Sequence, residues 1–591
     1  MYVCVCVCVC LCVCLYLCLS VSVSVCVQLS RVLAVPEDEL VGLIAAVPVK
    51  KGRPKADFHL PVQELLERDI IASKAEPNAI VENIARQVTS DGNICVTSAP
   101  SSACLEFTIH RPLLAQTVLQ RVLNDGVSYG LLHNHVPQKV VVEFSSPNIA
   151  KKFHAGHVRS TIIGNFLANL HEILGDDVIR INYFGDWGLQ FGLLGSAFQR
   201  FGSKKELEKN PLQHLFEVYV RINAETEREP SLMEDARKFS ACLEMGEPSA
   251  LALWEHFRAL SLENYSRLYK RLGVRFDEYD GESQYRDAVH EVVSCLRDQG
   301  LLQISEQGTG VVDISPSQDM SSYATVTRSD GSSLYLTRDL AAAIDRMKRH
   351  QFDRMYYVTD HSQELHFQQV FLTLQRMGHS WANRCQHVQF GRVLGMKTRF
   401  GDVVFLEDVL DEARTRALHS MASTDTTKIM EDPEETAEHL GLAAIIIHDF
   451  HGDICRNYQF DWDRVLRRRG DTGVYLQYTH ARLCSLEREQ ETQASTNFDP
   501  ECLHEMPAIQ LIQHLMSYDE ALHKAWMELQ PRSLVQYLLQ LSRLVSVVHK
   551  QLPVKGSPPQ VAQARKVLLC SARNVLASGL NLLGIRPVEK M

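Results

Sequence analysis

A strand, a helix and a second strand follow one another between residues 139 and 188, and this run constrains the fold more than any other part of the chain. The strands are the apolar runs KVVVEFSS (139–146) and DDVIRINYFGDWG (176–188). The segment between them, AGHVRSTIIGNFLANLHEILG (155–175), has apolar residues at helical spacing and ends at a glycine. Continuous apolar runs are typical of parallel strands covered on both faces. The pattern therefore predicts a βαβ unit in an α/β fold.

Two more apolar runs further along the chain predict strands of the same sheet. They are MYYVTD (355–360) and HVQFGRVLG (387–395). Before them, the sequence from Lys204 to about Leu301 is charged and has mainly helical spacing. We therefore predict a doubly wound sheet that carries a helical insertion.

The sequence on either side of this region predicts further domains, which suits a length of 591 residues. Residues 29–128 mix short strand and helix patterns and predict a small α+β domain. The α/β domain occupies residues 129–414. Residues 415–591 have helical period almost throughout, which predicts an all-α bundle. Residues 1–28 form a separate Val/Cys segment.

The first 27 residues, MYVCVCVCVCLCVCLYLCLSVSVSVCV, carry no charge and hold eight of the 17 cysteines. They lack the basic n-region of a secretory signal and the Arg-rich character of a mitochondrial presequence. A repeated GT dinucleotide encodes alternating Val and Cys, so we interpret the segment as a translated DNA repeat and not as native structure. A membrane anchor is the alternative, because the length would suffice to span a bilayer.

The other nine cysteines are scattered, with no CxxC pair and no nearby histidines at zinc-ligand spacing. We expect a reducing compartment, no disulfides and no structural metal. The formal net charge of −10 gives no global attraction to nucleic acid or to a membrane surface. A site for a polyanion would therefore need a local basic patch.

The turn between the first strand and its helix contains HAGH, with His154 and His157 on either side of Gly156. It matches neither the P-loop pattern GxxxxGK[ST] nor the dinucleotide pattern GxGxxG. A helix N-terminus suits a phosphate, and two imidazoles can donate hydrogen bonds to its oxygens. Taken alone, the tetrapeptide is also compatible with two solvated loop histidines or, less readily, with a two-histidine metal site.

The wider sequence favours the phosphate interpretation. SSPNIAKKFHAGHVRSTIIGNFLANL and RINYFGDWGLQFGLL resemble the catalytic core of class I aminoacyl-tRNA synthetases, specifically the arginyl-tRNA synthetases. HAGH stands where that class has its HIGH signature. The resemblance spans residues 29–591 and continues through GESQY, SLYLTRDLAAAIDR, GMKTRFGDVVFLEDVL, GVYLQYTHARL and LLGIRPVEKM. It implies a Rossmann-type catalytic domain with a helical insertion, an N-terminal α+β domain that contacts tRNA and a C-terminal all-α anticodon-binding domain.

The resemblance also implies a reaction and its partners. ATP, accompanied by Mg²⁺, would activate L-arginine to arginyl-adenylate, and the arginyl group would then pass to the 3′ end of tRNA(Arg). AKKFHAGH and the MKTR run are most like the mitochondrial form, so the resemblance implies the mitochondrial matrix. We expect a monomer with no membrane attachment. Two alternatives remain: another nucleotidyl transferase with an HxGH turn, and a catalytically silent RNA-binding relative.

Catalytic roles fall, by resemblance, on His154 and His157 at the ATP phosphates, with Ala155 and Gly156 beside them. The second class I signature, KMSKS, is replaced here by MKTRF, which has Phe400 where a basic residue is usual. Phenylalanine cannot bind phosphate. The resemblance therefore implies that Lys151, just before HAGH, supplies the missing charge. Helper roles at ATP are expected for two residues of the loop, Lys397 and Arg399.

The arginine site follows by the same route. A guanidinium calls for planar acceptors, which carboxylates supply as paired, charge-assisted hydrogen bonds. Glu282 and Asp339 stand where the family places such carboxylates, with Tyr335 beside them, and Asn148 and Gln363 match residues near the α-amino and carboxylate end. Without the resemblance, Glu282 reads as a solvated acid, and Asp339 reads as an acid near a helix start that Thr337 would cap. For Asp186, a turn-capping role is nearly as well supported as contact with the substrate, and Gln190 belongs to the same signature.

Recognition of tRNA is expected in the helical C-terminal region. Tyr475 and Tyr478 are spaced to share one helical face, and aromatic faces stack on unpaired bases. Taken alone, a tyrosine pair at this spacing is more often part of a core. Tyr537 and Met591 are further anticodon candidates by resemblance. Four arginines are candidate phosphate contacts: Arg482, Arg543, Arg565 and Arg573.

Overall fold

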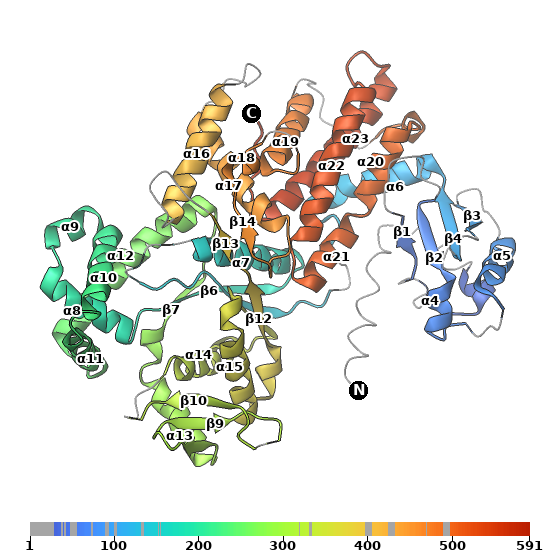
Figure 1. Ribbon diagram of the computed structural model, residues 1–591. Coiled ribbons are helices and arrows are strands. Elements are labelled where there is room, and N and C mark those ends of the chain that lie inside the picture. Colours follow the sequence, from blue (N-terminus) through green and yellow to red (C-terminus); the bar gives the residue numbers. More distant parts are fainter. Residues whose placement is uncertain are drawn as a thin grey trace. The chain divides into compact units, whose positions relative to one another are not determined.

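The computed structural model describes most of the chain beyond residue 28 (Figure 1). The described residues are 29–36, 40, 43–47, 56–71, 75–88, 94–99, 103–131, 135–149, 151, 153, 155–317, 319–329, 334–395, 405–423, 432–467, 470–488 and 497–591. The Val/Cys segment lies outside them. The chain forms two compact units: an α/β unit of residues 136–416 and 452–464, and a second unit that combines the parts before 136 with residues 417–451 and 465–591.

The α/β unit is built on a five-stranded parallel sheet with strand order β12-β11-β5-β6-β7. The βαβ prediction is confirmed, because β5 and β6 pair in parallel and α7 connects them. The valines of β5 are fully buried, which explains its apolar sequence. The elements of this core are β5 (Lys139–Glu143), α7 (Ala155–Ile173), β6 (Asp177–Phe184), β7 (Glu278–Gly281), β11 (Arg354–Asp360) and β12 (Cys385–Phe390).

The insertion between β6 and β7 is helical, as the sequence predicts. It contains α8 (Leu189–Phe201), α9 (Lys204–Lys209), α10 (Pro211–Thr226), α11 (Ser231–Glu244) and α12 (Pro248–Leu272). The predicted extent of this helical region is wrong in one respect, because β7 lies within residues 204–301 and joins the main sheet. Its sequence EYDG is short and acidic, so it carries no apolar signal of a buried strand.

A smaller antiparallel sheet follows β7 and was not expected from the sequence. Its strands are β8 (Leu302–Ile304), β9 (Gly310–Asp313) and β10 (Tyr323–Thr327). The helices and 3-10 turns around it are η3 (Glu282–Tyr285), α13 (Ala288–Asp298), α14 (Tyr335–His350), η4 (His361–Gln363), α15 (Glu364–Arg376) and η5 (Ser380–Arg384). One buried cluster joins residues of β9, β10, α13, α14 and α15, so this sheet and its helices share a core.

The second unit begins with the predicted α+β part, an antiparallel sheet of order β1-β2-β4-β3. Its elements are β1 (Ala45–Ala46), β2 (Phe58–Pro61), α4 (Val62–Glu67), α5 (Pro77–Gln87), β3 (Ile94–Ala99), β4 (Cys104–Ile109), α6 (Arg111–Asp125) and η2 (Gly126–Ser128). The buried carboxylate of Asp57 accepts hydrogen bonds from the Ile109 amide at 2.7 Å and from the Gln513 side chain. The α+β part and the helical part therefore share one unit.

The helical part of the second unit is the predicted all-α bundle. Its elements, with α16 and α18 at the borders of the units, are α16 (Leu406–Ala422), α17 (Pro433–Phe450), α18 (Trp462–Val465), α19 (Gly473–Arg488), η6 (Pro500–Cys502), α20 (Met506–Met516), α21 (Tyr518–Glu528), α22 (Arg532–Gln551) and α23 (Pro559–Leu582). Gly473 is required where α19 meets α17, because an added Cβ would lie 2.0 Å from the Ala443 carbonyl oxygen. In the part of the chain that the structure describes, no helix is long and apolar enough to cross a membrane.

Candidate active site

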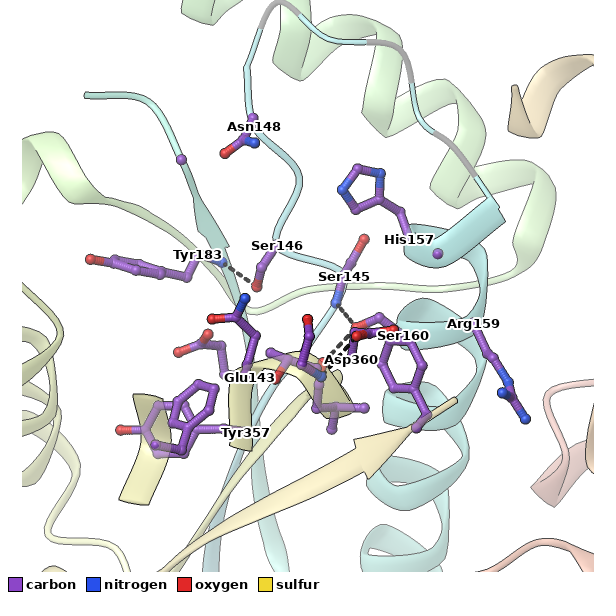
Figure 2. A pocket seen from close by; sticks show the side chains of 18 of the residues that line it. Glu143, Ser145, Ser146, Asn148, His157, Arg159, Ser160, Tyr183, Tyr357 and Asp360 are labelled. Atoms are coloured by element: carbon purple, nitrogen blue, oxygen red, sulfur yellow. Dashed lines mark hydrogen bonds between the residues drawn. The ribbon is translucent and has the colours of Figure 1, made fainter. Parts of the chain in front are cut away.

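A cavity of about 530 Å³ opens at the carboxyl ends of β5, β6 and β11, beside the start of α7 (Figure 2). In open parallel sheets this edge is where ligands bind. The cavity contains seven residues that the sequence singled out: Asn148, Gly156, His157, Glu282, Tyr335, Asp339 and Gln363. They come from segments up to 215 positions apart, since Asn148 and Gln363 are both among them.

The backbone leaves β5 through an unusual turn. Ser145 and Ser146 have φ angles of 71° and 45°, in the left-handed region that non-glycine residues seldom adopt. Hydrogen bonds hold this geometry: the Ser145 amide donates to Ser160 Oγ at 2.9 Å, and the Ser146 amide donates to Asn182 Oδ1 at 3.1 Å. The turn is thus fixed between α7 and β6, with Asn148 and the first turn of α7 on the cavity wall.

One end of the cavity is the N-terminus of α7. Gly156 and His157 line it there, and Figure 2 shows the His157 ring directed toward Asn148 while Arg159 points to the opposite side of the helix. The ring of Phe153 packs edge-on against His157 at 5.1 Å between centroids. Unpaired amides and the positive end of the helix dipole favour an anion here. His154 and the side chain of Ala155 lie outside the described residues.

The other end of the cavity carries three carboxylates: Glu143, Glu282 and Asp339. Burial raises the pKa of Glu143 to about 7, although the Arg346 guanidinium opposes this shift. Burial also raises the pKa of Glu282 to about 8, although the Arg338 guanidinium opposes this shift. The charge of Asp339 adds to both shifts. These carboxyl groups are poorly solvated, so a cation placed among them would be stabilised.

Each carboxylate in this acidic end has a basic partner. Arg346 donates to Glu143, and Arg338 Nη1 donates to Glu282 at 3.1 Å. His366 Nε2 lies 2.6 Å from Asp339 Oδ2, and its ring packs against Tyr335 at 4.6 Å between centroids. Three carboxylates thus lie at one end of the cavity, with helix amides and an imidazole at the other, and a fourth carboxylate, Asp360 at the end of β11, also lines the cavity.

Sequence reasoning about helix caps needs one correction. The helix of Asp339 begins at Tyr335 with Leu334 as its N-cap, so Thr337 is not the cap. The Thr337 hydroxyl instead donates to the Val326 carbonyl. Asp339 is the fifth residue of α14, beyond the first turn where the dipole alone would favour it. The helix dipole alone therefore does not explain why Asp339 lies at the cavity.

Lys151 lies apart from the cavity. Its ammonium donates to Gln190 Oε1 at 2.9 Å and lies 4.9 Å from the centroid of the Tyr219 ring. It lines a neighbouring crevice that shares Asn148 with the cavity. Its predicted partners in the loop, Lys397 and Arg399, lie outside the described residues, as does Phe400.

Asp186 takes the capping role that was one of its two sequence interpretations. Its side chain is fully buried and accepts hydrogen bonds from the amide and the hydroxyl of Ser283, at 2.9 and 2.8 Å. Arg258 Nε donates to it at 3.1 Å. Asp186 thus holds the 3-10 turn that presents Glu282. Over the described ranges, no group of three or more His, Cys, Asp or Glu side chains is arranged to hold a metal ion.

Comparison with known proteins shows the family of this chain. The model of the class I tRNA synthetase (R) catalytic domain matches residues 118–462. A mitochondrial probable arginine–tRNA ligase from Bos taurus is 54% identical over 568 residues, covering 95% of this chain and 98% of the relative. The chain belongs to the arginyl-tRNA synthetase family. The Homo sapiens mitochondrial relative has the same identity and coverage. The arginine–tRNA ligase of Saccharomyces cerevisiae mitochondria is 40% identical and spans 93% of this chain and 86% of its own.

Solved structures share the fold of this arginyl-tRNA synthetase. The Thermus thermophilus arginyl-tRNA synthetase superposes with a TM-score of 0.78 at 23% identity, covering 97% of this chain and all of that one. The Plasmodium falciparum arginyl-tRNA synthetase gives a TM-score of 0.75 at 21% identity, over 93% and 94% of the two chains. The predicted fold class is confirmed: a class I catalytic domain with a helical C-terminal domain.

The model of the DALR anticodon binding domain matches residues 476–591 of this synthetase. There Tyr478 is 47% exposed, whereas the Tyr475 hydroxyl donates to the Ser542 carbonyl at 3.1 Å. The ring of Tyr537 is 7% exposed, stacks on His514 at 4.2 Å between centroids and lies 5.3 Å from the centroid of the Tyr518 ring.

The remaining tRNA candidates are engaged within the protein. Met591 packs against the buried cluster of α16, α17 and α19. The four arginines each have a side-chain partner: Arg482 with His549, Arg543 with Asp471, Arg565 with Glu505 and Arg573 with Glu487.

Sequence reasoning missed Glu143, which lines the cavity, and two residues that contact its carboxylates, Arg346 and His366. Glu143 ends an apolar strand, and a charge at the carboxyl end of a buried parallel strand is a signal that could have found it. Arg346 and His366 lie within amphipathic helices, where their spacing does not separate them from surface residues.

Proposed function

We propose that this arginyl-tRNA synthetase attaches L-arginine to tRNA(Arg) in the mitochondrial matrix, as a monomer. The carboxylate of arginine attacks the α-phosphorus of ATP, which forms arginyl-adenylate and releases diphosphate. A terminal hydroxyl of the tRNA then attacks the activated carbonyl and releases AMP. The mitochondrial assignment is supported by the names of the relatives that are 54% identical. Mg²⁺ enters with ATP as part of the substrate.

One observation carries the proposal: a single cavity has buried carboxylates at one end and a helix N-terminus at the other. The guanidinium of arginine binds at Glu282 and Asp339, where charge-assisted hydrogen bonds also relieve the poor solvation of these groups. Glu143 lies at the same end as a further acceptor. Tyr335, which packs against His366, flanks the guanidinium.

The other end of the amino acid and the nucleotide fill the rest of the cavity. Asn148 and Gln363 bind the α-amino and carboxylate groups of arginine. The ATP phosphates lie against Gly156 and Ala155 at the start of α7, where His154 and His157 donate hydrogen bonds to the oxygens as charge develops on them. Catalysis is then a matter of positioning and electrostatic stabilisation, without a covalent intermediate on the enzyme.

The positive charge for the triphosphate comes from Lys151, with Lys397 and Arg399 as helpers. Lys151 must leave Gln190 for this role, since its ammonium now bonds that side chain. A hydrogen bond to a neutral amide oxygen and a cation–π contact are readily exchanged for a triphosphate, because the ammonium binds charged oxygens more strongly than a neutral acceptor. The neighbouring crevice shares Asn148 and Gly185 with the cavity, so the distance to cross is short.

Arginine should bind more tightly as the pH rises from 6 to about 8. Glu143 and Glu282, with pKa values of about 7 and about 8, carry protons below those values, and a guanidinium favours their ionised forms. Binding therefore releases protons. The KM for arginine should fall by about tenfold per pH unit between about 7 and 8, fall more steeply below about 7, where both groups are protonated, and level off above about 8. The pH dependence of KM in aminoacylation measures this. A KM that stays flat between pH 6 and 8 would refute the assignment of these carboxyl groups.

The helical domain binds the anticodon loop, with Tyr478 as the stacking residue and with Tyr475 and Met591 at the edge of the surface. The N-terminal α+β part contacts the tRNA elsewhere. Loss of a base–aromatic stack costs about 1–3 kcal/mol. Tyr478→Ala should therefore raise the KM for tRNA by about 5- to 150-fold and leave the KM for arginine unchanged. Met527→Ala, which removes a side chain exposed by 50% in the same unit, is the matched control.

Charging of tRNA tests the proposed function. Purified protein is incubated with labelled arginine, ATP and tRNA(Arg), and label in acid-precipitable tRNA is counted. Only a synthetase charges the RNA; another nucleotidyl transferase or a silent RNA-binding relative leaves it unlabelled. Periodate-oxidised tRNA, which lacks the accepting hydroxyl groups, serves as the control.

A further inference from the structure

Arg346 lies beneath the acidic end of the cavity and does not itself line it. Its side chain is 1% exposed, which makes it one of the largest fully buried side chains of the described residues. Its Nη1 donates to Glu143, and its Nε lies 3.6 Å from Asp280 Oδ2. Burial of a guanidinium has a large desolvation cost, so an apolar residue would be more stable at this position unless the charge had a function.

Two tyrosine rings enclose the Arg346 guanidinium. Its carbon lies 4.9 Å from the centroid of Tyr183 and 5.9 Å from that of Tyr357. Both tyrosines line the cavity, and among the described residues their buried hydroxyl groups have no hydrogen-bond partner. The guanidinium is therefore fixed by a carboxylate on one side and by aromatic faces on others.

The surroundings of this pair contain more acids than bases. The charges of Asp280 and Asp339 disfavour the ionised form of Glu143, and the Arg346 guanidinium favours it. The titratable groups that face Arg346 or Glu143 from the neighbouring elements are Tyr183 on β6, Asp280 on β7, Tyr285 on η3, Asp339 on α14, Tyr357 on β11 and Cys385 on β12.

We propose that Arg346 is a positioning residue that keeps Glu143 ionised and directed into the cavity, and that it thereby makes the cavity prefer a cationic side chain over its neutral isostere. The inference rests on the proposed function, because the cation in question is the arginine guanidinium. An ionised Glu143 accepts hydrogen bonds from a guanidinium. A protonated Glu143 instead presents an O–H donor, which opposes a guanidinium and suits the carbonyl oxygen of a ureido group.

Arg346→Gln tests this with arginine and citrulline, the neutral ureido analogue. Removal of the cation lets burial and the neighbouring acids raise the pKa of Glu143 further above about 7. We expect the pH at which the KM for arginine levels off to move upward. We also expect the preference for arginine over citrulline to fall by about tenfold or more at pH 7. This preference is measured as the ratio of the inhibition constant of citrulline to the KM for arginine. Arg346→Lys, which keeps the charge, should restore much of both properties.

Arg180→Gln is the matched control. Arg180 is also 1% exposed, lies on β6 of the main sheet and pairs with a glutamate, Glu172, away from the cavity. If the role of Arg346 were purely structural, both Gln variants would lose thermal stability to the same extent. Both would also keep the pH profile and the citrulline discrimination of the wild type. That result would overturn the proposal.

Glu143→Gln provides a second test that does not require Arg346→Gln to fold on its own, because Glu143→Gln alone should also lower the preference for arginine over citrulline. With no ionisable group at residue 143, adding Arg346→Gln should change neither the pH profile nor the citrulline discrimination any further. A further change of either property in the double variant would contradict a role exerted through Glu143. A failure of the proposed function looks different, because the wild-type protein itself would then show no arginine-dependent charging of tRNA.

Discussion

Asp339→Asn should raise the KM for arginine by about 100-fold. The substitution keeps the size of the side chain but removes a charged acceptor that lines the acidic end of the cavity. Hydrogen bonds to charged groups contribute about 1.5–3 kcal/mol each, and about 2.8 kcal/mol corresponds to a factor of 100. Aminoacylation kinetics at varied arginine concentration measure the effect. The KM for ATP and for tRNA should remain within about threefold of wild type, since neither substrate touches this carboxylate.

The same variant should also shift the pH profile in a defined direction. The charge of Asp339 raises the pKa of Glu143 and of Glu282, so its removal should lower both. The KM for arginine should then level off at a lower pH than in the wild type. Asp298→Asn, an exposed acid at the end of α13, is the control and should change nothing. An Asp339→Asn enzyme with wild-type arginine kinetics would remove Asp339 from the substrate site.

His157→Ala should lower kcat by about 10²- to 10³-fold while the KM for arginine changes by less than about threefold. His157 lines the phosphate end of the cavity, where charge grows on the phosphate oxygens only as the bond to arginine forms. An interaction made in the transition state lowers kcat, whereas one made equally in the ground state would raise KM. Diphosphate exchange and single-turnover charging separate the activation step from the transfer step.

The control for this variant is another histidine of the α/β unit. His290 on α13 is exposed and lies far along the chain from the cavity residues of α7, so His290→Ala should retain wild-type kcat. If His157→Ala raised KM and left kcat unchanged, His157 would bind the nucleotide without favouring the transition state.

The sequence predicted those strands of the main sheet that are apolar. β5 and the middle of β11 are buried and apolar, and β6 is buried over its last five residues. β7 pairs with β6 at the edge of the sheet and has the sequence EYDG, so no local pattern marks it as a strand. The small sheet formed by β8, β9 and β10 was not predicted either, and its first strand, β8, is only three residues long and has no buried residue.

The sequence predicted the site residues that belong to a recognisable motif. It did not predict those that only the packing of distant elements brings together. Motif positions such as Asn148, His157 and Asp339 do line one cavity. The pairing of Glu143 with Arg346, 203 residues apart, depends on how α14 packs against the sheet, which no local pattern records. The orientation of Lys151 toward Gln190 likewise depends on the fold of the insertion and not on the residues beside it.

The structure of the protein bound to a non-hydrolysable analogue of arginyl-adenylate would test where the two ends of the substrate bind. We expect the guanidinium within hydrogen-bond distance of Glu282 and Asp339, and the group that replaces the phosphate beside His157 at the start of α7. Binding in the reverse orientation, or in the other large cavity of the α/β unit beside Asp345 and Lys348, would contradict this expectation.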